Sequence, residues 1–236
     1  MNPAASTGRK GLGSGLELRA SPMYLGINNN RGQQLMRFLT VVFAASLFWT
    51  GAGSAADDAS VRIEMATGEG DIVIELYLDK APVTAGNFLN LVDNGDLDGG
   101  SFYRVVNAGN DRGSPKIDVI QGGLGNDAEG FDTIAHETTA DTGILHTDGV
   151  ISMARGAVGT ASTEFFICIG DQPGLDHGEA RNADGQGFAA FGKVVSGMDV
   201  VRRINGLPAA AESYSEYTKG QILNDPVSIN RVQRVD

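Results

Sequence analysis

The sequence is poor in the residues that bind metals and form disulfides. Its 236 residues include one cysteine and three histidines. One cysteine cannot form an internal disulfide, and Cys168 stands in the apolar run Phe165–Ile169, which predicts a small buried side chain. His136, His146 and His177 show no H-x-x-x-H or E-x-x-H spacing. The sequence therefore predicts no metal site.

Basic residues are scarce beyond residue 56. The whole chain has a net charge of −11, but residues 1–56 hold five basic side chains and one acid, so residues 57–236 carry a net −15. A segment this acidic repels the phosphates of nucleic acids and anionic lipid head groups. It also lacks the basic stripe typical of nucleic-acid-binding proteins. We therefore expect neither nucleic acid nor a membrane as a partner of the processed chain.

The chain also lacks an apolar run of the roughly 20 residues that cross a bilayer. Its most apolar segment, Phe38–Trp49, has twelve residues and follows Arg37. Small residues come next, and both Gly53-Ser54-Ala55 and Ser54-Ala55-Ala56 fit a cleavage site. This order predicts a signal peptide at residues 36–56, with an uncleaved membrane anchor as the alternative. The mature protein is then expected to be periplasmic or secreted.

Residues 1–35 do not fit an export signal, because they are polar, rich in glycine and asparagine, and without periodicity. Two interpretations are open. Either translation starts at Met36, which we favour, or residues 1–35 are a disordered leader. The folded domain is placed at residues 57–236.

Glycine, in contrast, is abundant, with 33 residues spread between short apolar runs. Val61, Ile63 and Met65 alternate with polar neighbours, and a second run, Ile72–Leu78, follows a turn that contains glycine. This pair predicts a β-hairpin. Further short runs are Phe102–Val106, Val119–Gln121, Val150–Met153, Phe165–Ile169, Phe188–Val195 and Val227–Val232. With no βαβ rhythm, the pattern predicts one mainly β domain.

Two short helices are expected between these runs. The first begins at Pro82, where proline is tolerated in a first turn, and ends before Gly95; the second covers Met198–Asn205. Most connections are expected to be short, except 107–116 and 171–187, and long loops in compact domains are often functional. The apolar residues spaced for one face of the first helix are Val83, Phe88, Leu91 and Val92.

Three groups of residues, in this order, carry a resemblance to a known family. The first is SFYRVV at 101–106 with VIQGG at 119–123. The second is GVISMAR at 149–155 with TASTEFFI at 160–167. The third is GLD at 174–176 with FAAFGKV at 188–194. Together they resemble a cyclophilin over about residues 61–232, and several departures suggest a bacterial exported branch.

The resemblance implies an all-β fold, namely an eight-stranded antiparallel closed β-barrel capped by two short α-helices, with the substrate groove outside the barrel. It also implies peptidyl-prolyl cis-trans isomerase activity. This reaction rotates an X–Pro amide over a barrier of about 18–20 kcal/mol. No covalent bond is made or broken, so no nucleophile, metal or cofactor is expected.

Arg104 matches the family's catalytic arginine. In the twisted amide the prolyl nitrogen gains a lone pair, and a cationic donor beside it stabilises that state selectively. A guanidinium suits this role because it stays charged and presents several donors in one plane.

The resemblance assigns substrate binding to further positions. Phe166 matches the floor of the proline pocket, and because Phe165 precedes it on a strand, one ring is expected inside the barrel and the other in the groove. The side-chain amide of Gln121 is expected to bind the substrate backbone. The remaining expected contacts are the pocket walls Val119 and Leu175, the strand edge at Ala154 and Arg155, and Phe188 and Glu164.

At four positions in or beside this expected site, the residue differs from the one common in familiar cyclophilins. Glu164 stands where glutamine is common, and its carboxylate is expected to orient Arg104, or else to compete for its hydrogen bonds. Asp118 replaces an aromatic residue. Gly174 replaces a tryptophan whose indole N–H is a donor for cyclosporin, so weak inhibition by cyclosporin is expected. Phe188 replaces a histidine, which makes the pocket more apolar.

The expected partners are proline-containing polypeptides, unfolded or exported, and the protein is expected to be a monomer. The main alternative is a proline-peptide-binding chaperone or scaffold module with little turnover; a less favoured one is an unrelated barrel that binds a small ligand. A guanidinium of Arg104 sequestered by Glu164 or Asp118 would favour the binding module.

Overall fold

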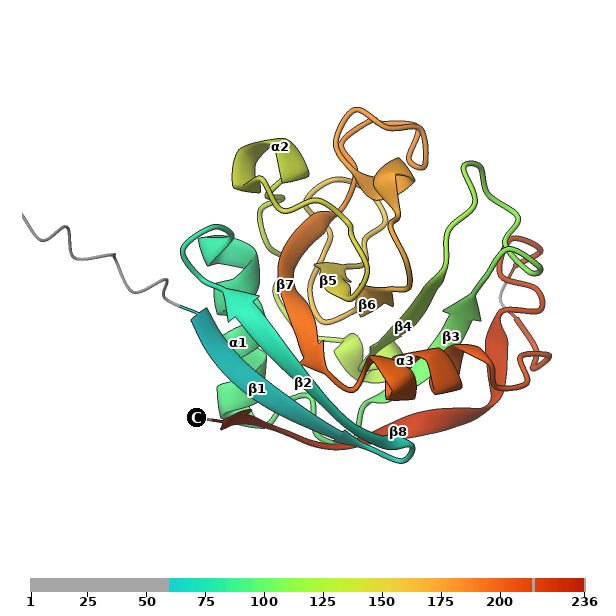
Figure 1. Cartoon of the computed structure of the whole chain (residues 1–236), viewed down its shortest axis with the longest axis horizontal. Helices are drawn as coiled ribbons and strands as arrows, with labels where there is room; N and C mark the ends of the chain where they lie inside the picture. Colours follow the sequence, from blue (N-terminus) through green and yellow to red (C-terminus); the bar gives the residue numbers. More distant parts are fainter. Residues whose placement is uncertain (1–59, 214, 236) are drawn as a thin grey trace, which may run out of the picture. The chain divides into compact units, whose positions relative to one another are not determined.

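The computed structural model describes residues 60–213 and 215–235 (Figure 1). The predicted signal peptide at 36–56 and the segment 1–35 lie outside the described residues. Eight antiparallel strands close into one barrel in the order β1-β2-β7-β5-β6-β4-β3-β8, which confirms the predicted fold class. Their bounds are β1 Ser60–Thr67, β2 Gly70–Tyr77, β3 Ser101–Val106, β4 Val119–Gly123, β5 Val150–Met153, β6 Phe165–Cys168, β7 Ala189–Ser196 and β8 Ile222–Val235.

Both expected helices are present. Helix α1 covers Pro82–Asn94 and packs on β2, β7 and β8, whereas α3 covers Met198–Asn205 and packs on β2, β3 and β4. The structure adds a one-turn helix, α2 (Thr139–Thr142), and two 3₁₀ turns, η1 (Gly125–Ala128) and η2 (Pro173–Leu175). Within the described residues, no helix is long and apolar enough to cross a membrane.

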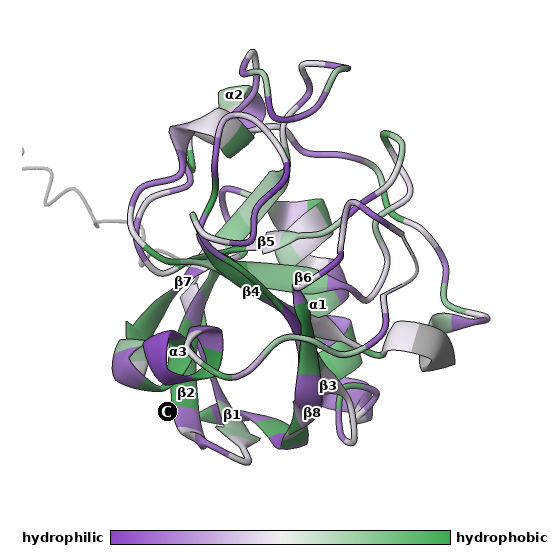
Figure 2. Ribbon diagram, turned by 90° about the vertical axis from the view of Figure 1, so that its right-hand side faces the viewer, coloured by the Kyte–Doolittle hydropathy of each residue, from purple (hydrophilic) through white to green (hydrophobic). Residues whose placement is uncertain are grey.

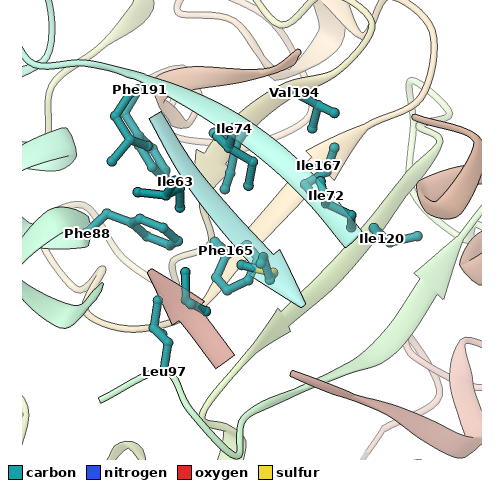
Figure 3. Packing of buried hydrophobic residues seen from close by; sticks show 14 of the residues in the cluster. Ile63, Ile72, Ile74, Phe88, Leu97, Ile120, Phe165, Ile167, Phe191 and Val194 are labelled. Carbon is teal, nitrogen blue, oxygen red and sulfur yellow. The ribbon is translucent and has the colours of Figure 1, made fainter. Parts of the chain in front are cut away.

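Helix α1 closes one end of the barrel with Phe88. Its ring centroid lies 5.3 Å from that of Phe165 on β6 and 5.0 Å from that of Phe191 on β7, so three segments share one aromatic cluster (Figure 3). Gly95 ends the helix in the left-handed conformation, with φ of 73°, as glycine at this position predicts. Val83 does not share the buried face, because its side chain is exposed near the first turn.

The N-terminus of α1 is capped from another loop. The N-cap residue Ala81 provides no side-chain acceptor. Instead the carboxylate of Glu137 accepts hydrogen bonds from the backbone N–H groups of Val83 (3.1 Å) and Thr84 (2.7 Å) and from the Thr84 hydroxyl (2.6 Å). A negative charge at this end also suits the helix dipole. Glu137 thereby ties α1 to the long connection between β4 and β5.

More of the connections between strands are long than the sequence predicted. The loops expected to be long, 107–116 and 171–187, lie within the observed connections 107–118 and 169–188, but 124–149 and 206–221 are long as well. The sequence did not indicate these two loops as long. The connection 124–149 is interrupted by the short helices η1 and α2, and 206–221 is mostly polar. Figure 2 shows that β4 and β6, from which three of these loops start or end, are mostly hydrophobic strands.

Strand β3 contains an irregularity that matters for function. Its register shifts between Phe102 and Arg104 against both β4 and β8. Phe102 and Val105 both belong to the barrel core, so two residues lie between successive inward positions. Regular alternation would place Arg104 on the same side as Phe102. The bulge instead turns both Tyr103 and Arg104 outward.

Candidate active site

A cavity of about 210 Å³ lies on the outer face of β3, β4 and β6. Eight of the nine predicted site residues line it, and Glu164 does not. Four lining residues were not predicted. The full lining is Arg104, Ile117, Val119, Gln121, Ala154, Arg155, Phe166, Leu175, Arg181, Asn182, Phe188 and Tyr217.

The floor of this cavity is a small apolar cluster separate from the barrel core. Phe166 belongs to it and is almost fully buried, whereas its neighbour Phe165 is in the barrel core. The expected division of the two rings between barrel and groove is thus observed. Phe188 meets Phe166 edge to face, with ring centroids 5.3 Å apart. The other buried members are Val106, Val119, Cys168 and Leu175.

Cys168 lies beneath the floor as a buried free thiol, and burial raises its pKa well above the usual value. The small buried side chain that the sequence predicted is thus observed, and a thiol in this state is protonated and unreactive.

His146 supports Phe166 from behind. The two rings stack at 15° with centroids 6.0 Å apart. The imidazole is held by the Asp176 carboxylate, 2.7 Å from Nδ1, and by the Ser152 hydroxyl, 3.0 Å from Nε2. These residue types resemble a hydrolytic triad, but Ser152 is fully buried and no substrate reaches it. The group therefore fixes the pocket floor.

Arg104 is held by neutral amide oxygens. Its Nε and Nη2 donate to Oε1 of Gln221 at 3.0 and 2.6 Å, and its Nη1 donates to Oε1 of Gln121 at 2.8 Å. Within the described part of the chain, Arg104 forms no ion pair. Burial lowers its pKa from the usual value, yet a guanidinium remains protonated at neutral pH. Its positive charge is therefore not neutralised by a carboxylate.

Glu164 has a different partner from the one expected. Its carboxylate accepts a hydrogen bond from the Tyr103 hydroxyl and another from the backbone N–H of Gly125 at 2.8 Å. The Tyr103 hydroxyl in turn accepts from Nε2 of Gln121 at 2.8 Å. Glu164 thus reaches Arg104 only through Tyr103 and Gln121, because the bulge turns Tyr103 into the space between them. Neither direct orientation of Arg104 by Glu164 nor direct competition is observed.

Asp118 is also removed from Arg104. Its side chain lies near Asn205 of α3, and burial raises its pKa. Neither carboxylate suspected of sequestering Arg104 does so.

Arg155 lines the cavity but its guanidinium is engaged elsewhere. It donates to both oxygens of Asp184, at 2.8 and 2.9 Å, and to the carbonyl of Gly187 at 2.9 Å. The hydrogen bonds from Arg155, together with one from the backbone N–H of Gln186, lower the pKa of Asp184 to about 2. The guanidinium carbon also lies 5.4 Å from the ring centroid of Phe188. The side chain therefore fixes the 169–188 loop, a role that the sequence did not predict.

Arg181 lines the cavity and joins three loops at its edge. It donates to both carboxylate oxygens of Asp111 (2.7 and 2.9 Å), to the Pro115 carbonyl (2.8 Å) and to the Tyr217 hydroxyl (2.8 Å). The Arg181 and Asp111 side chains are 4% and 0% exposed. Two features of the sequence could have indicated these residues as candidates for the site. Arg181 lies in a loop that the sequence predicts to be long, and Tyr217 is an aromatic residue in a polar segment. Gln221 lies outside the resembling motifs.

The packing of the 107–118 loop requires glycine at position 174. A Cβ on this residue would lie 2.2 Å from Cγ of Pro115. The 107–118 loop therefore occupies the space that a side chain at position 174 would need. The described residues contain no group of three histidine, cysteine or acidic side chains that could hold a metal ion.

The fold and site are thus a closed antiparallel barrel with an arginine beside an apolar pocket on its outer face. Residues 61–233 match the family described as cyclophilin type peptidyl-prolyl cis-trans isomerase/CLD. This chain therefore belongs to the cyclophilin-type peptidyl-prolyl cis-trans isomerases, and it is an isomerase. The family binds proline-containing peptides.

Individual relatives agree with this assignment. A peptidyl-prolyl cis-trans isomerase of Acinetobacter baylyi is 35% identical over 184 residues, which cover 74% of this chain and 86% of the relative. Peptidyl-prolyl cis-trans isomerase B of Escherichia coli is 31% identical over 174 residues, covering 70% and 96%. The crystal structure of a cyclophilin type isomerase of Cryptosporidium parvum has a TM-score of 0.54 at 19% identity, covering 75% and 98%, and supports the fold.

Proposed function

We propose that this isomerase accelerates X–Pro rotation in exported proteins, with Arg104 stabilising the twisted amide. The observation that carries the mechanism is the state of Arg104. Its guanidinium shares one cavity with the apolar floor of Phe166, and its hydrogen-bond acceptors are the amide oxygens of Gln121 and Gln221. A proline ring on Phe166 would present its nitrogen to a cation that pairs with no carboxylate among residues 60–213 and 215–235.

In the proposed mechanism, the apolar floor of the cavity binds the substrate proline. A proline ring fits a pocket formed by Phe166, Val119 and Leu175, because these side chains offer apolar surface and no competing charge. A solved Cryptosporidium parvum neighbour was crystallised in the presence of the dipeptide Ala-Pro, with a TM-score of 0.53 to this chain. We propose the same ligand class for this cavity.

The transition-state stage uses the charge of Arg104. Twisting the amide removes resonance and localises a lone pair on nitrogen. A fixed donor in a partly desolvated groove stabilises this state more than either planar form, and that difference lowers the barrier. The two amide oxygens hold the guanidinium in place before substrate arrives.

Arg104→Ala tests the mechanism. We expect the rate of cis-to-trans conversion of an Ala-Pro-Phe peptide to fall by about 10²–10³-fold, the usual loss for one transition-state donor. Arg202→Ala is the matched control, because Arg202 is an exposed arginine on α3, paired with Asp148 outside the cavity. Circular dichroism checks the fold of each variant. Peptide binding without conversion in the wild type would support the binding module instead.

The export step rests on residues 36–56 alone. We propose that they direct the chain to the periplasm or the medium and are then removed, leaving a monomer. Expression of the full chain in a bacterium, fractionation and N-terminal sequencing test this. A mature chain beginning at Ala56 or Asp57 supports export, and light scattering gives the oligomeric state. An unprocessed cytoplasmic chain would contradict export.

A further inference from the structure

The strand order gives the groove a direction. Neighbouring strands run β8-β3-β4-β6-β5 across this face of the barrel (Figure 1). The lining residues follow the same order, from Tyr217 before β8, through Arg104 on β3 and Phe166 on β6, to Ala154 after β5. The cyclophilin resemblance implies that the residue before the proline lies along Ala154. With that placement and the proline on Phe166, the strand order directs the rest of the peptide over Arg104 toward Tyr217.

Tyr217 is an exposed aromatic ring on a rigid base. Its side chain lines the cavity, and the residue is 47% exposed. The guanidinium carbons of Arg104 and Arg181 each lie 5.9 Å from its ring centroid, and its hydroxyl accepts a hydrogen bond from Arg181. Arg181 is itself fixed by the buried carboxylate of Asp111. The ring is thus held in the open groove before any ligand binds, which reduces the entropy lost on binding.

Position 174 does not provide an aromatic wall at this end of the groove. Gly174 has no side chain, and Pro115 fills the space beside it. The apolar surface available there comes from Ile117 and Tyr217, both of which line the cavity. An aromatic side chain on the substrate would bury this surface and contact the Tyr217 ring.

We propose that Tyr217 is a specificity-determining residue that contacts the side chain following the substrate proline and favours an aromatic one. The inference rests on the proposed placement of the proline on Phe166. A single aromatic contact of this kind corresponds to a preference of about fivefold.

The test compares two peptides, Ala-Ala-Pro-Phe and Ala-Ala-Pro-Ala, with the purified protein. Exchange spectroscopy by NMR follows the isomerisation at several peptide concentrations without a coupling protease. We expect kcat/KM of the wild type to be about fivefold higher for the phenylalanine peptide, mainly through KM. Tyr217→Ala should bring this ratio toward 1, whereas Tyr217→Phe should retain it because the ring remains.

Val195→Ala is the control, since Val195 is equally exposed (47%) but lies on β7 outside the cavity. It should retain the wild-type ratio. A wild-type ratio preserved in Tyr217→Ala overturns the inference. A higher kcat/KM for a Glu-containing third peptide, Ala-Ala-Pro-Glu, also overturns it, because the arginines would then dominate. Wild-type protein that is inactive toward every peptide contradicts the proposed function instead, which separates the two failures.

Discussion

The side-chain oxygen of Gln221 accepts two hydrogen bonds from Arg104, from Nε at 3.0 Å and from Nη2 at 2.6 Å. Gln221 is fully buried, and its own amide nitrogen donates to the carbonyl of Asn110 at 2.9 Å. That second bond fixes which way the amide points. Arg104 is thereby oriented by a neutral group that leaves its charge available.

Gln221→Glu should impair catalysis by replacing that neutral acceptor with a carboxylate. An ion pair would offset the charge of Arg104, and the donor to Asn110 would be lost. We expect kcat to fall by about tenfold or more with a smaller change in KM, because the lost interaction acts in the transition state. Steady-state kinetics on the Ala-Pro-Phe peptide measure this. An unchanged kcat would show that the charge of Arg104 does not depend on its acceptor.

Glu164→Gln tests the route from Glu164 to Arg104 through Tyr103 and Gln121. An amide at position 164 can still accept from Tyr103 but cannot replace both carboxylate oxygens, one of which accepts from Gly125. We expect a loss of about 1 kcal/mol in the free energy of unfolding and less than about threefold change in kcat/KM. Urea unfolding and kinetics measure the two effects.

Tyr103→Phe should affect catalysis more than Glu164→Gln does, because it removes the hydroxyl that Gln121 contacts. A loss above about 100-fold in Glu164→Gln alone would mean that the carboxylate acts on Arg104 directly.

Burial and the nearby charge of Glu164 raise the pKa of Tyr103 above its usual value, so its hydroxyl stays protonated. The rate should therefore show no inflection from this phenol up to about pH 10.

Gly174→Ala should destabilise the protein by about 1–3 kcal/mol, because the added Cβ would lie 2.2 Å from Cγ of Pro115. Gly86→Ala is the control. Gly86 lies in α1, where an added Cβ would meet no atom within 4 Å, and alanine there should stabilise by up to about 1 kcal/mol. Urea unfolding compares the two variants.

Cyclosporin inhibition provides a related test at Gly174. We expect weak inhibition of the wild type, as the sequence resemblance implied. Gly174→Trp should not restore strong inhibition, because Pro115 occupies the space that even a Cβ at position 174 would need. Strong inhibition of the wild type would show that another donor replaces the indole N–H.

The Asp111–Arg181 pair should make stability depend on acid pH. Burial raises the pKa of Asp111, but hydrogen bonds from Arg181 and from the backbone of Gly113 and Ile117 lower it by more, so the net pKa is below its usual value. Protons therefore bind the unfolded state first as pH falls. The stabilisation is complete above about pH 4 and is lost as pH drops through the folded-state pKa.

Asp111→Asn should remove this part of the pH dependence. Since both side chains of the pair are almost fully buried, the variant should also lose about 3–5 kcal/mol at neutral pH. Urea unfolding at about pH 7, 5 and 3 measures both effects. Equal pH dependence in wild type and variant would place the acid sensitivity elsewhere.

The sequence by itself determined the elements and the chemistry of most of the site. Alternating apolar residues fix strands because every second side chain meets the same face. That rule separated Phe165 from Phe166, and local stop residues such as Gly95 placed the helix ends. The motifs around Arg104 and Gln121 were enough to indicate the family.

Only the tertiary structure decided how Arg104 is held. The bulge at Tyr103 turns the arginine out of the barrel, and it is defined by the pairing of β3 with β4 and β8, which are distant in the sequence from one another. The acceptor Gln221 is 117 residues away in the sequence, and Glu164 is 61 residues from the tyrosine it binds. Hydrogen bonds between such distant residues leave no periodic pattern in the sequence, because their geometry exists only after the barrel has closed.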